Sequence, residues 1–189
     1  IVKMFQLIGQ DEKQATKSME AVMEIETRLA KKSFNAVEQR NPAANYHMLT
    51  LDELKKQIPG FDWDAYISAV GVKGVTSLNV SQIEPVQEAV AIINSLPMDK
   101  QKAYLQWKLI DSAASYLSDA FVAQNFEFYG KVMSGKKEDQ PRWKKAVGTV
   151  NGVLGEAVGQ MYVEKYFPAA AKERMVQLVK NLQTALGER

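Results

Sequence analysis

The chain has 189 residues, of which 46% are hydrophobic and 24% are charged. These values lie in the ordinary range of globular proteins, so one sizeable core and a single domain spanning residues 1–189 are expected. A formal net charge of +2 and the absence of cysteine exclude a strongly basic nucleic-acid or membrane surface and a disulfide-held scaffold.

The first half of the chain carries strong helix signals. Apolar residues at helical spacing predict a long amphipathic helix within Asp11–Lys32, with Asp11 as its N-cap. Asn35–Thr50 is expected to be a connector. Thr50 and Glu53 have the spacing of a capping box, which predicts a short helix ending at Pro59.

The middle of the chain is expected to contain three further segments. Asp62 predicts the N-cap of a short helix that turns four residues inward: Trp63, Tyr66, Ile67 and Val70. The stretch Gly71–Val80 is read as a loop with at most one short extended piece. Pro85 fits the first turn of a helix running to Leu96.

Two long helices are predicted in the second half. The first runs from about Pro97 to Gly135, and the second from Pro141 to Pro168. After Pro168 a last helix is expected to turn five apolar residues inward: Met175, Leu178, Val179, Leu182 and Leu186. The fold class is therefore all-α, an orthogonal or irregular bundle of several helices with two long ones.

The helix after Pro141 carries Gly148, Gly152, Gly155 and Gly159, whose spacing of 4, 3 and 4 puts them on one face. Interior glycines cost a helix about 1 kcal/mol each relative to alanine, so close packing of another helix against this face is expected. Phosphate-binding loops place glycines between a strand and a helix, which this pattern does not match. Charged residues interrupt the apolar run and exclude a membrane span.

Single residues that could carry chemistry have simpler structural explanations. His47 is the one histidine and lies in a turn, so structural hydrogen bonding or solvent exposure is favoured over catalysis. The paired carboxylates Asp62 with Asp64, and Glu24 with Glu26, are read as caps and solvated faces. A helical series of aromatic residues is read as core: Tyr104, Trp107, Tyr116, Phe121, Phe126, Phe128 and Tyr129.

Several motifs in order resemble the neprilysin family of zinc metallopeptidases, in its bacterial, cysteine-free branch. They are LDELKKQIPGFDWDAYISAVGV (51–72), YLQWKLIDSAASYLSDAF (104–121), FEFYGKVMSGKKEDQPRW (126–143) and LGEAVGQMYVEKYFP (154–168). The resemblance covers almost the whole chain and implies a fold like the second, helical domain of neprilysin.

The resemblance also implies what this chain lacks. The family binds zinc through HExxH, which a chain with one histidine cannot contain, so no catalytic, cofactor-binding or metal residue is assigned here. The chain is expected to be the amino-terminal, non-catalytic helical domain of a larger zinc endopeptidase. Zinc belongs to the parent enzyme, while the isolated fragment is expected to hydrolyse nothing.

By the same resemblance, this domain forms the lid or wall of a chamber that restricts substrates to short peptides. The implied partners are the catalytic domain of the same polypeptide and peptide substrates, and the implied location is extracytoplasmic. Ile1 and Arg189 are expected to interrupt helices, leaving a bare apolar patch. The alternative is a stand-alone helical protein-interaction module that lost the protease; an unrelated enzyme using carboxylates alone is a remote third reading.

Overall fold

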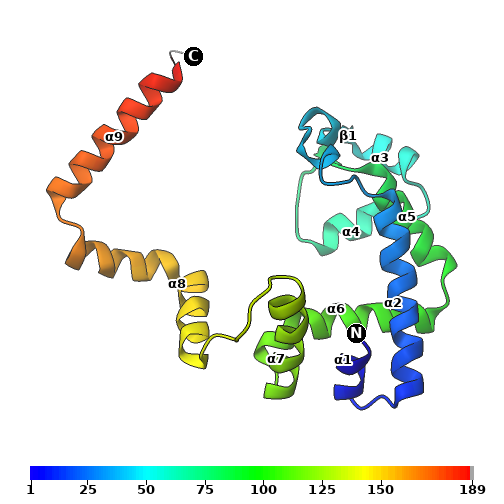
Figure 1. Cartoon of the computed structure of the whole chain (residues 1–189). Helices are drawn as coiled ribbons and strands as arrows, with labels where there is room; N and C mark the ends of the chain where they lie inside the picture. Colours follow the sequence, from blue (N-terminus) through cyan, green and yellow to red (C-terminus); the bar gives the residue numbers. More distant parts are fainter. Residues whose placement is uncertain (188–189) are drawn as a thin grey trace. The chain divides into compact units, whose positions relative to one another are not determined.

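The computed structural model describes residues 1–187 and is mainly helical, which confirms the all-α prediction (Figure 1). Internal contacts divide the chain into two compact units, Ile1–Ser134 and a second unit that begins at Gly135. A single domain over the whole chain stays a prediction. The expected interruption of a helix at Arg189 lies outside the described residues.

One core of the first unit forms where α1 (Val2–Leu7) and α6 (Met98–Ala113) pack against α2 (Glu12–Lys32). Helix α2 begins as predicted, because the Asp11 carboxylate accepts a hydrogen bond from the backbone N–H of Gln14 at 2.8 Å. Its apolar stripe contributes Ala15 and Val22 to this core. The buried residues are Met4, Phe5, Ala15, Val22, Ile110 and Ala114.

A second core lies at the other end of α2 (Figure 1). It combines a two-stranded sheet of β1 (Met48–Thr50) and β2 (Ser77–Asn79) with three helices: α3 (Leu51–Gln57), α4 (Trp63–Ala69) and α5 (Ile83–Ser95). The predicted capping box of Thr50 and Glu53 is present at the start of α3. The buried residues are Leu49, Leu54, Ile58, Trp63, Val80 and Val90.

The sheet shows what local sequence reasoning missed. Its antiparallel register pairs Met48 with Asn79, Leu49 with Leu78 and Thr50 with Ser77. The expected short extended piece is β2, but its partner β1 lies in the segment expected to be a connector. Two 3₁₀ turns, η1 (Glu38–Arg40) and η2 (Ala43–Asn45), fill the rest of that connector.

The predicted helix of about 35 residues from Pro97 to Gly135 is wrong. Helix α6 ends at Ala113 and is followed by the 3₁₀ turn η3 (Ala114–Tyr116), helix α7 (Asp119–Asn125) and the π-helix η4 (Phe126–Val132). The backbone becomes extended at Leu117 and Ser118, which is the N-cap of α7. Serine favours such a position, and the turn lets α7 contact α1.

The second unit contains α8 (Arg142–Tyr166) and α9 (Ala169–Gly187), separated at Pro168 as predicted. Helix α8 is kinked at Leu154, where φ is −117° and ψ is 20°, between Gly152 and Gly155. Kinks at glycines are common because glycine stabilises the helical backbone poorly. Neither helix has a buried residue in the described part of the chain, so the prediction that α9 turns its apolar residues inward is wrong.

The predicted inward packing is also wrong for Tyr66 of α4 and for Val70, the C-cap of that helix. Trp63 is buried as predicted and donates its indole N–H to the carbonyl oxygen of Ile58 at 2.9 Å. Tyr66 and Val70, however, are exposed. Of the aromatic series, Tyr104, Trp107 and Phe121 pack against the first core, whereas Tyr116, Phe128 and Tyr129 are exposed and are not core residues. Helical spacing alone did not reveal which face would have a neighbour.

Candidate functional site

The glycine face of α8 has no close neighbour within the described part of the second unit. A Cβ added at Gly148, Gly152, Gly155 or Gly159 would meet no atom within 4 Å. No other helix of the second unit therefore packs closely against this face, and the expected close approach of another helix stays a prediction.

Helices α8 and α9 also expose large apolar side chains. The most exposed include Val153 at 77%, Leu186 at 73% and Met161 at 72%. Exposed apolar surface on this scale is typical of an interaction surface. The expectation of a bare apolar patch stays a prediction.

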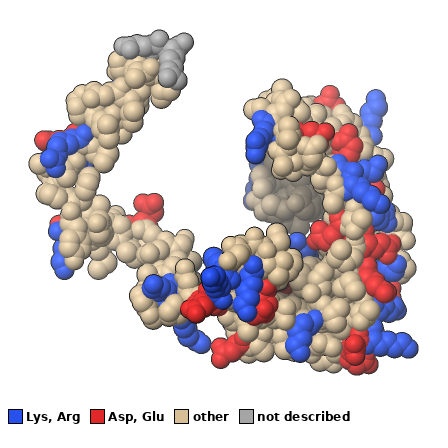
Figure 2. Space-filling view, viewed as in Figure 1, with Lys and Arg blue, Asp and Glu red and all other residues tan. Residues whose placement is uncertain are grey.

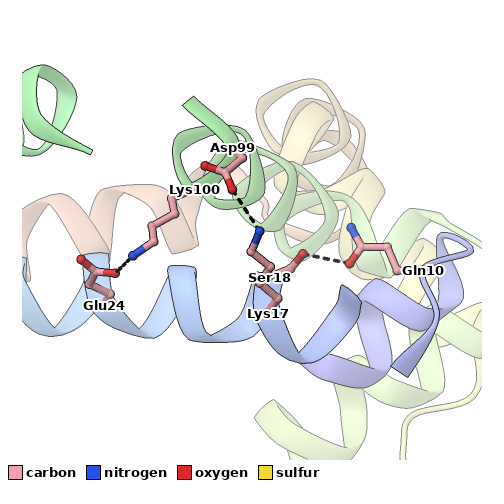
Figure 3. Close-up of polar contacts among 6 residues, drawn as sticks. All are labelled: Gln10, Lys17, Ser18, Glu24, Asp99 and Lys100. Atoms are coloured by element: carbon pink, nitrogen blue, oxygen red, sulfur yellow. Dashed lines mark hydrogen bonds and ion pairs between the residues drawn. The ribbon is translucent and has the colours of Figure 1, made fainter. Parts of the chain in front are cut away.

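The first unit has a polar cleft of about 510 Å³ between α2 and the start of α6. Figure 3 shows two ion pairs that cross it: Lys17 Nζ lies 3.3 Å from Asp99 Oδ2, and Lys100 Nζ lies 2.6 Å from Glu24 Oε2. The hydrogen bond from Lys17 lowers the pKa of Asp99 below its usual value. These contacts hold the beginning of α6 against α2.

The carboxylates of the two ion pairs in this cleft are neutralised by lysine side chains. Each carboxylate in the two bridges already has an ammonium partner, so neither is prepared to act as a general base. Ser18 is buried and its hydroxyl donates to Gln10 Oε1 at 2.9 Å (Figure 3). An amide oxygen cannot take the serine proton as an activating base would, so Ser18 has no nucleophile's environment.

The residues singled out from the sequence have structural roles. His47 Nδ1 lies 3.0 Å from the carbonyl oxygen of Val80, which joins the two strands of the sheet. Asp62 accepts the backbone N–H of Ala65 at 2.9 Å as an N-cap, and Asp64 pairs with Lys55 at 2.7 Å. The predictions of structural hydrogen bonding at His47 and of an N-cap at Asp62 are confirmed.

A tyrosine–carboxylate pair on α2 and α6 was not found by sequence reasoning. Tyr104 donates its hydroxyl to Glu26 Oε1 at 3.1 Å, and burial together with that carboxylate raises the pKa of Tyr104 to about 12. A second tyrosine, Tyr129 of η4, donates to Asp111 at 2.9 Å, and its pKa is also raised, first by burial and then by this hydrogen bond. Both tyrosines stay protonated near neutral pH and join separate helices.

The donor set does not fit the zinc that the resemblance implies for the parent enzyme. The chain has one histidine and no cysteine. Within residues 1–187 no three His, Cys, Asp or Glu side chains are grouped so that they could hold a metal ion. Figure 2 shows lysines and acidic residues interspersed over the visible face of the first unit, without a broad patch of one sign.

Comparison with known proteins decides the family. The sequence profile described as Peptidase family M13, for its N-terminal region, matches residues 1–189. The chain belongs to peptidase family M13. The M13 chain is 31% identical over 178 residues to human membrane metallo-endopeptidase-like 1. The aligned region covers 90% of this chain and 23% of the relative. It is 24% identical over 188 residues to rat endothelin-converting enzyme 1, covering 95% of this chain and 24% of the relative.

Solved structures agree with the family assignment. The M13 chain matches the zinc metalloprotease ZMP1 of Mycobacterium tuberculosis in complex with an inhibitor at a TM-score of 0.87 and 33% identity. It matches the same protease in an open state at a TM-score of 0.85. Both matches cover 97% of this chain, but only 28% and 29% of the protease chains.

The M13 chain therefore spans about a quarter of the length of the curated relatives, given as 23% and 24% for the two named above. Of the helices described, none combines the length and apolar character needed to cross a membrane.

Proposed function

We propose that this chain is the amino-terminal, non-catalytic helical region of an M13 zinc endopeptidase, where it forms one wall of a chamber that admits short peptides. The observation that carries the proposal is the match of 97% of the chain to part of a zinc metalloprotease. Other structures of that protease are described as open and partially open, which supports a part that moves relative to the rest.

The role of such a wall is steric. Closure over a bound peptide excludes water and large substrates from the reacting centre, whereas bond cleavage needs the metal and a general base. Zinc, when bound in the parent enzyme, supplies a Lewis acid and an activated water. The residues of this chain do not fit that metal, so its ligands belong to another part of the parent polypeptide.

The partner in this proposal is the catalytic domain of the same polypeptide. The apolar residues exposed on α8 and α9 give it a contact surface, and the four-glycine face of α8 permits close approach of backbone. Peptides are the substrates of the parent enzyme. An extracytoplasmic location, as implied by the family resemblance, is part of the same proposal.

The first test is the coding sequence downstream of residue 189, read for an in-frame HExxH and a later glutamate ligand. The second is kinetic and uses the full-length polypeptide with a series of peptides of increasing length and one folded protein. We expect kcat/KM to fall steeply with length. A catalytic region lacking Ile1–Ser134 should cleave the shortest peptide and lose this discrimination.

The controls keep the outcomes distinct. Retained zinc and retained hydrolysis of the shortest peptide show that the shortened enzyme is folded. An unchanged length limit in that enzyme contradicts the chamber role. A stop codon directly after residue 189 would instead favour the stand-alone interaction module, a reading that the exposed apolar side chains of α8 and α9 also fit.

A further inference from the structure

Strand β2 has one edge without a partner strand among the described residues. On its other side, Val80 N donates to His47 O at 3.0 Å and Leu51 N donates to Thr76 O at 3.4 Å. With the register of Leu49 opposite Leu78, these bonds show that the even-numbered positions of this strand face β1. In an antiparallel pair, successive residues direct their N–H and C=O groups to opposite edges.

The odd-numbered positions Ser77 and Asn79 therefore present their backbone groups to the free edge. Neither residue has a hydrogen-bond partner for its backbone N–H or C=O group within residues 1–187, and both residues are exposed. The Asn79 side chain is occupied elsewhere, since its Oδ1 accepts the backbone N–H of His47 at 2.7 Å. A row of unpaired groups at every second residue is the template to which another extended chain can pair.

The two edges of the sheet differ in this respect. On β1, the backbone N–H of Thr50 is taken by the carboxylate of Glu53 at 2.8 Å, as part of the capping box. That edge is therefore partly closed by the protein itself. The β2 edge remains open to an incoming strand.

An apolar groove of about 590 Å³ lies beside the open edge. Residues 78–82 line one part of it, and no charged residue is among those that line it. The apolar lining includes Phe61, Trp63, Tyr66, Val86 and Ile93. Trp63 packs edge-to-face against Phe61, with ring centroids 4.8 Å apart, and against Tyr66 at 6.1 Å. Volume and lining are those of a ligand pocket.

We propose that the β2 edge and this groove together bind an extended peptide that carries an aromatic or large aliphatic side chain. The peptide main chain adds as a third strand and exchanges hydrogen bonds with Ser77 and Asn79. One of its apolar side chains enters the groove, because a charged side chain would be desolvated there without a partner. Main-chain bonds give affinity in this mode of recognition, and the neighbouring pocket gives selectivity.

The proposal goes beyond the chamber role and does not depend on it. It assigns a non-catalytic peptide site to the first unit, and the binding can be measured on the 189-residue chain without any catalytic domain. Failure of peptide binding leaves the chamber role untouched, and loss of the chamber role leaves this site testable.

The probe is the blocked pentapeptide acetyl-Thr-Val-Phe-Val-Thr-amide, titrated into the ¹⁵N-labelled chain and followed by amide chemical shifts. We expect saturable binding with the largest shifts at Ser77 and Asn79. A variant probe with lysine in place of phenylalanine should bind at least about tenfold more weakly, because the groove lining carries no compensating charge. Absence of saturation at millimolar probe, or shifts centred on another surface, overturns the proposal.

Two methylated probes test strand addition without altering the protein. In one, N-methyl groups replace the amide hydrogens of two alternate residues, and in the other they replace those of the intervening residues. Only one set faces β2, so one probe should lose about tenfold or more in affinity while the other keeps most of it. Equal effects of the two probes are incompatible with strand addition.

A variant pair tests the groove. Tyr66→Ala removes a half-exposed aromatic side chain from the groove and should weaken binding about fivefold, as truncation of an aromatic contact residue does. Tyr116→Ala removes an exposed tyrosine that does not line the groove and should leave affinity unchanged. Equal weakening by both variants, or none by the first, overturns the assignment of the groove.

Discussion

Replacement of Gly130 by alanine tests the packing of the π-helix η4. A Cβ at this position would lie 3.0 Å from Phe126 Cγ and closer still to two other carbons of that ring. Overpacking of this kind costs about 1–3 kcal/mol, because the ring must leave its position. The contacts are so close that a cost of about 3 kcal/mol is expected, and alanine recovers up to about 1 kcal/mol of helix propensity, so the net loss of unfolding free energy should be about 2 kcal/mol.

The matched control is Gly148→Ala in α8. There the added Cβ meets no atom within 4 Å, so only the propensity gain applies, and a stabilisation of up to about 1 kcal/mol is expected. If the change in unfolding free energy has opposite signs at Gly130 and Gly148, the effect of local packing is distinguished from that of intrinsic helix propensity.

The assay is urea unfolding, followed by far-UV circular dichroism and by tryptophan fluorescence. The chain has three tryptophans, and a Trp143→Phe background leaves Trp63 and Trp107, both in the first unit, as reporters for Gly130→Ala. Phe126→Leu should relieve most of the loss, which a double-mutant cycle measures as coupling. If Gly130→Ala is neutral or stabilising, or if Phe126→Leu brings no relief, the steric reasoning is refuted.

Three further predictions concern the first unit. Asp11→Ala removes the N-cap of α2 and should lower the unfolding free energy by about 1 kcal/mol, measured by urea unfolding; Asp11→Asn, which can still cap, should cost much less. Trp63→Phe leaves the carbonyl of Ile58 without its buried donor and should cost about 1–3 kcal/mol, with an unchanged midpoint contradicting the reading. Tyr104→Phe should cost about 1 kcal/mol at pH 8. Because the folded pKa of about 12 lies above the usual value of 10.0, this tyrosine's contribution is complete below pH 10 and is lost as pH rises toward 12; a wild-type-minus-variant difference that stays constant up to pH 11 would contradict the assignment.

Local signals in the sequence determined where several helices begin. Asp11 and Thr50 act within three residues of their own position, so a single sequence is enough to identify them as caps. Pro168 separates α8 from α9 because it has no backbone N–H and fixes φ, which are also local properties. Composition alone excluded an HExxH zinc site from this chain, since one histidine cannot supply two ligands.

Tertiary structure decided the features that depend on distant neighbours. The pairing of β1 with β2 joins Met48 to Asn79, and nothing within either three-residue strand specifies that partner. The break between α6 and α7 overrode a continuous helical pattern because α7 packs against α1. Helical spacing predicted that Tyr66 faces inward and that the glycines of α8 lie on a packed face. A face is buried only where another element covers it, and the spacing of residues within one helix does not show which element that is. The open β2 edge and its groove could be recognised only once the paired strands, α4 and α5 were in place.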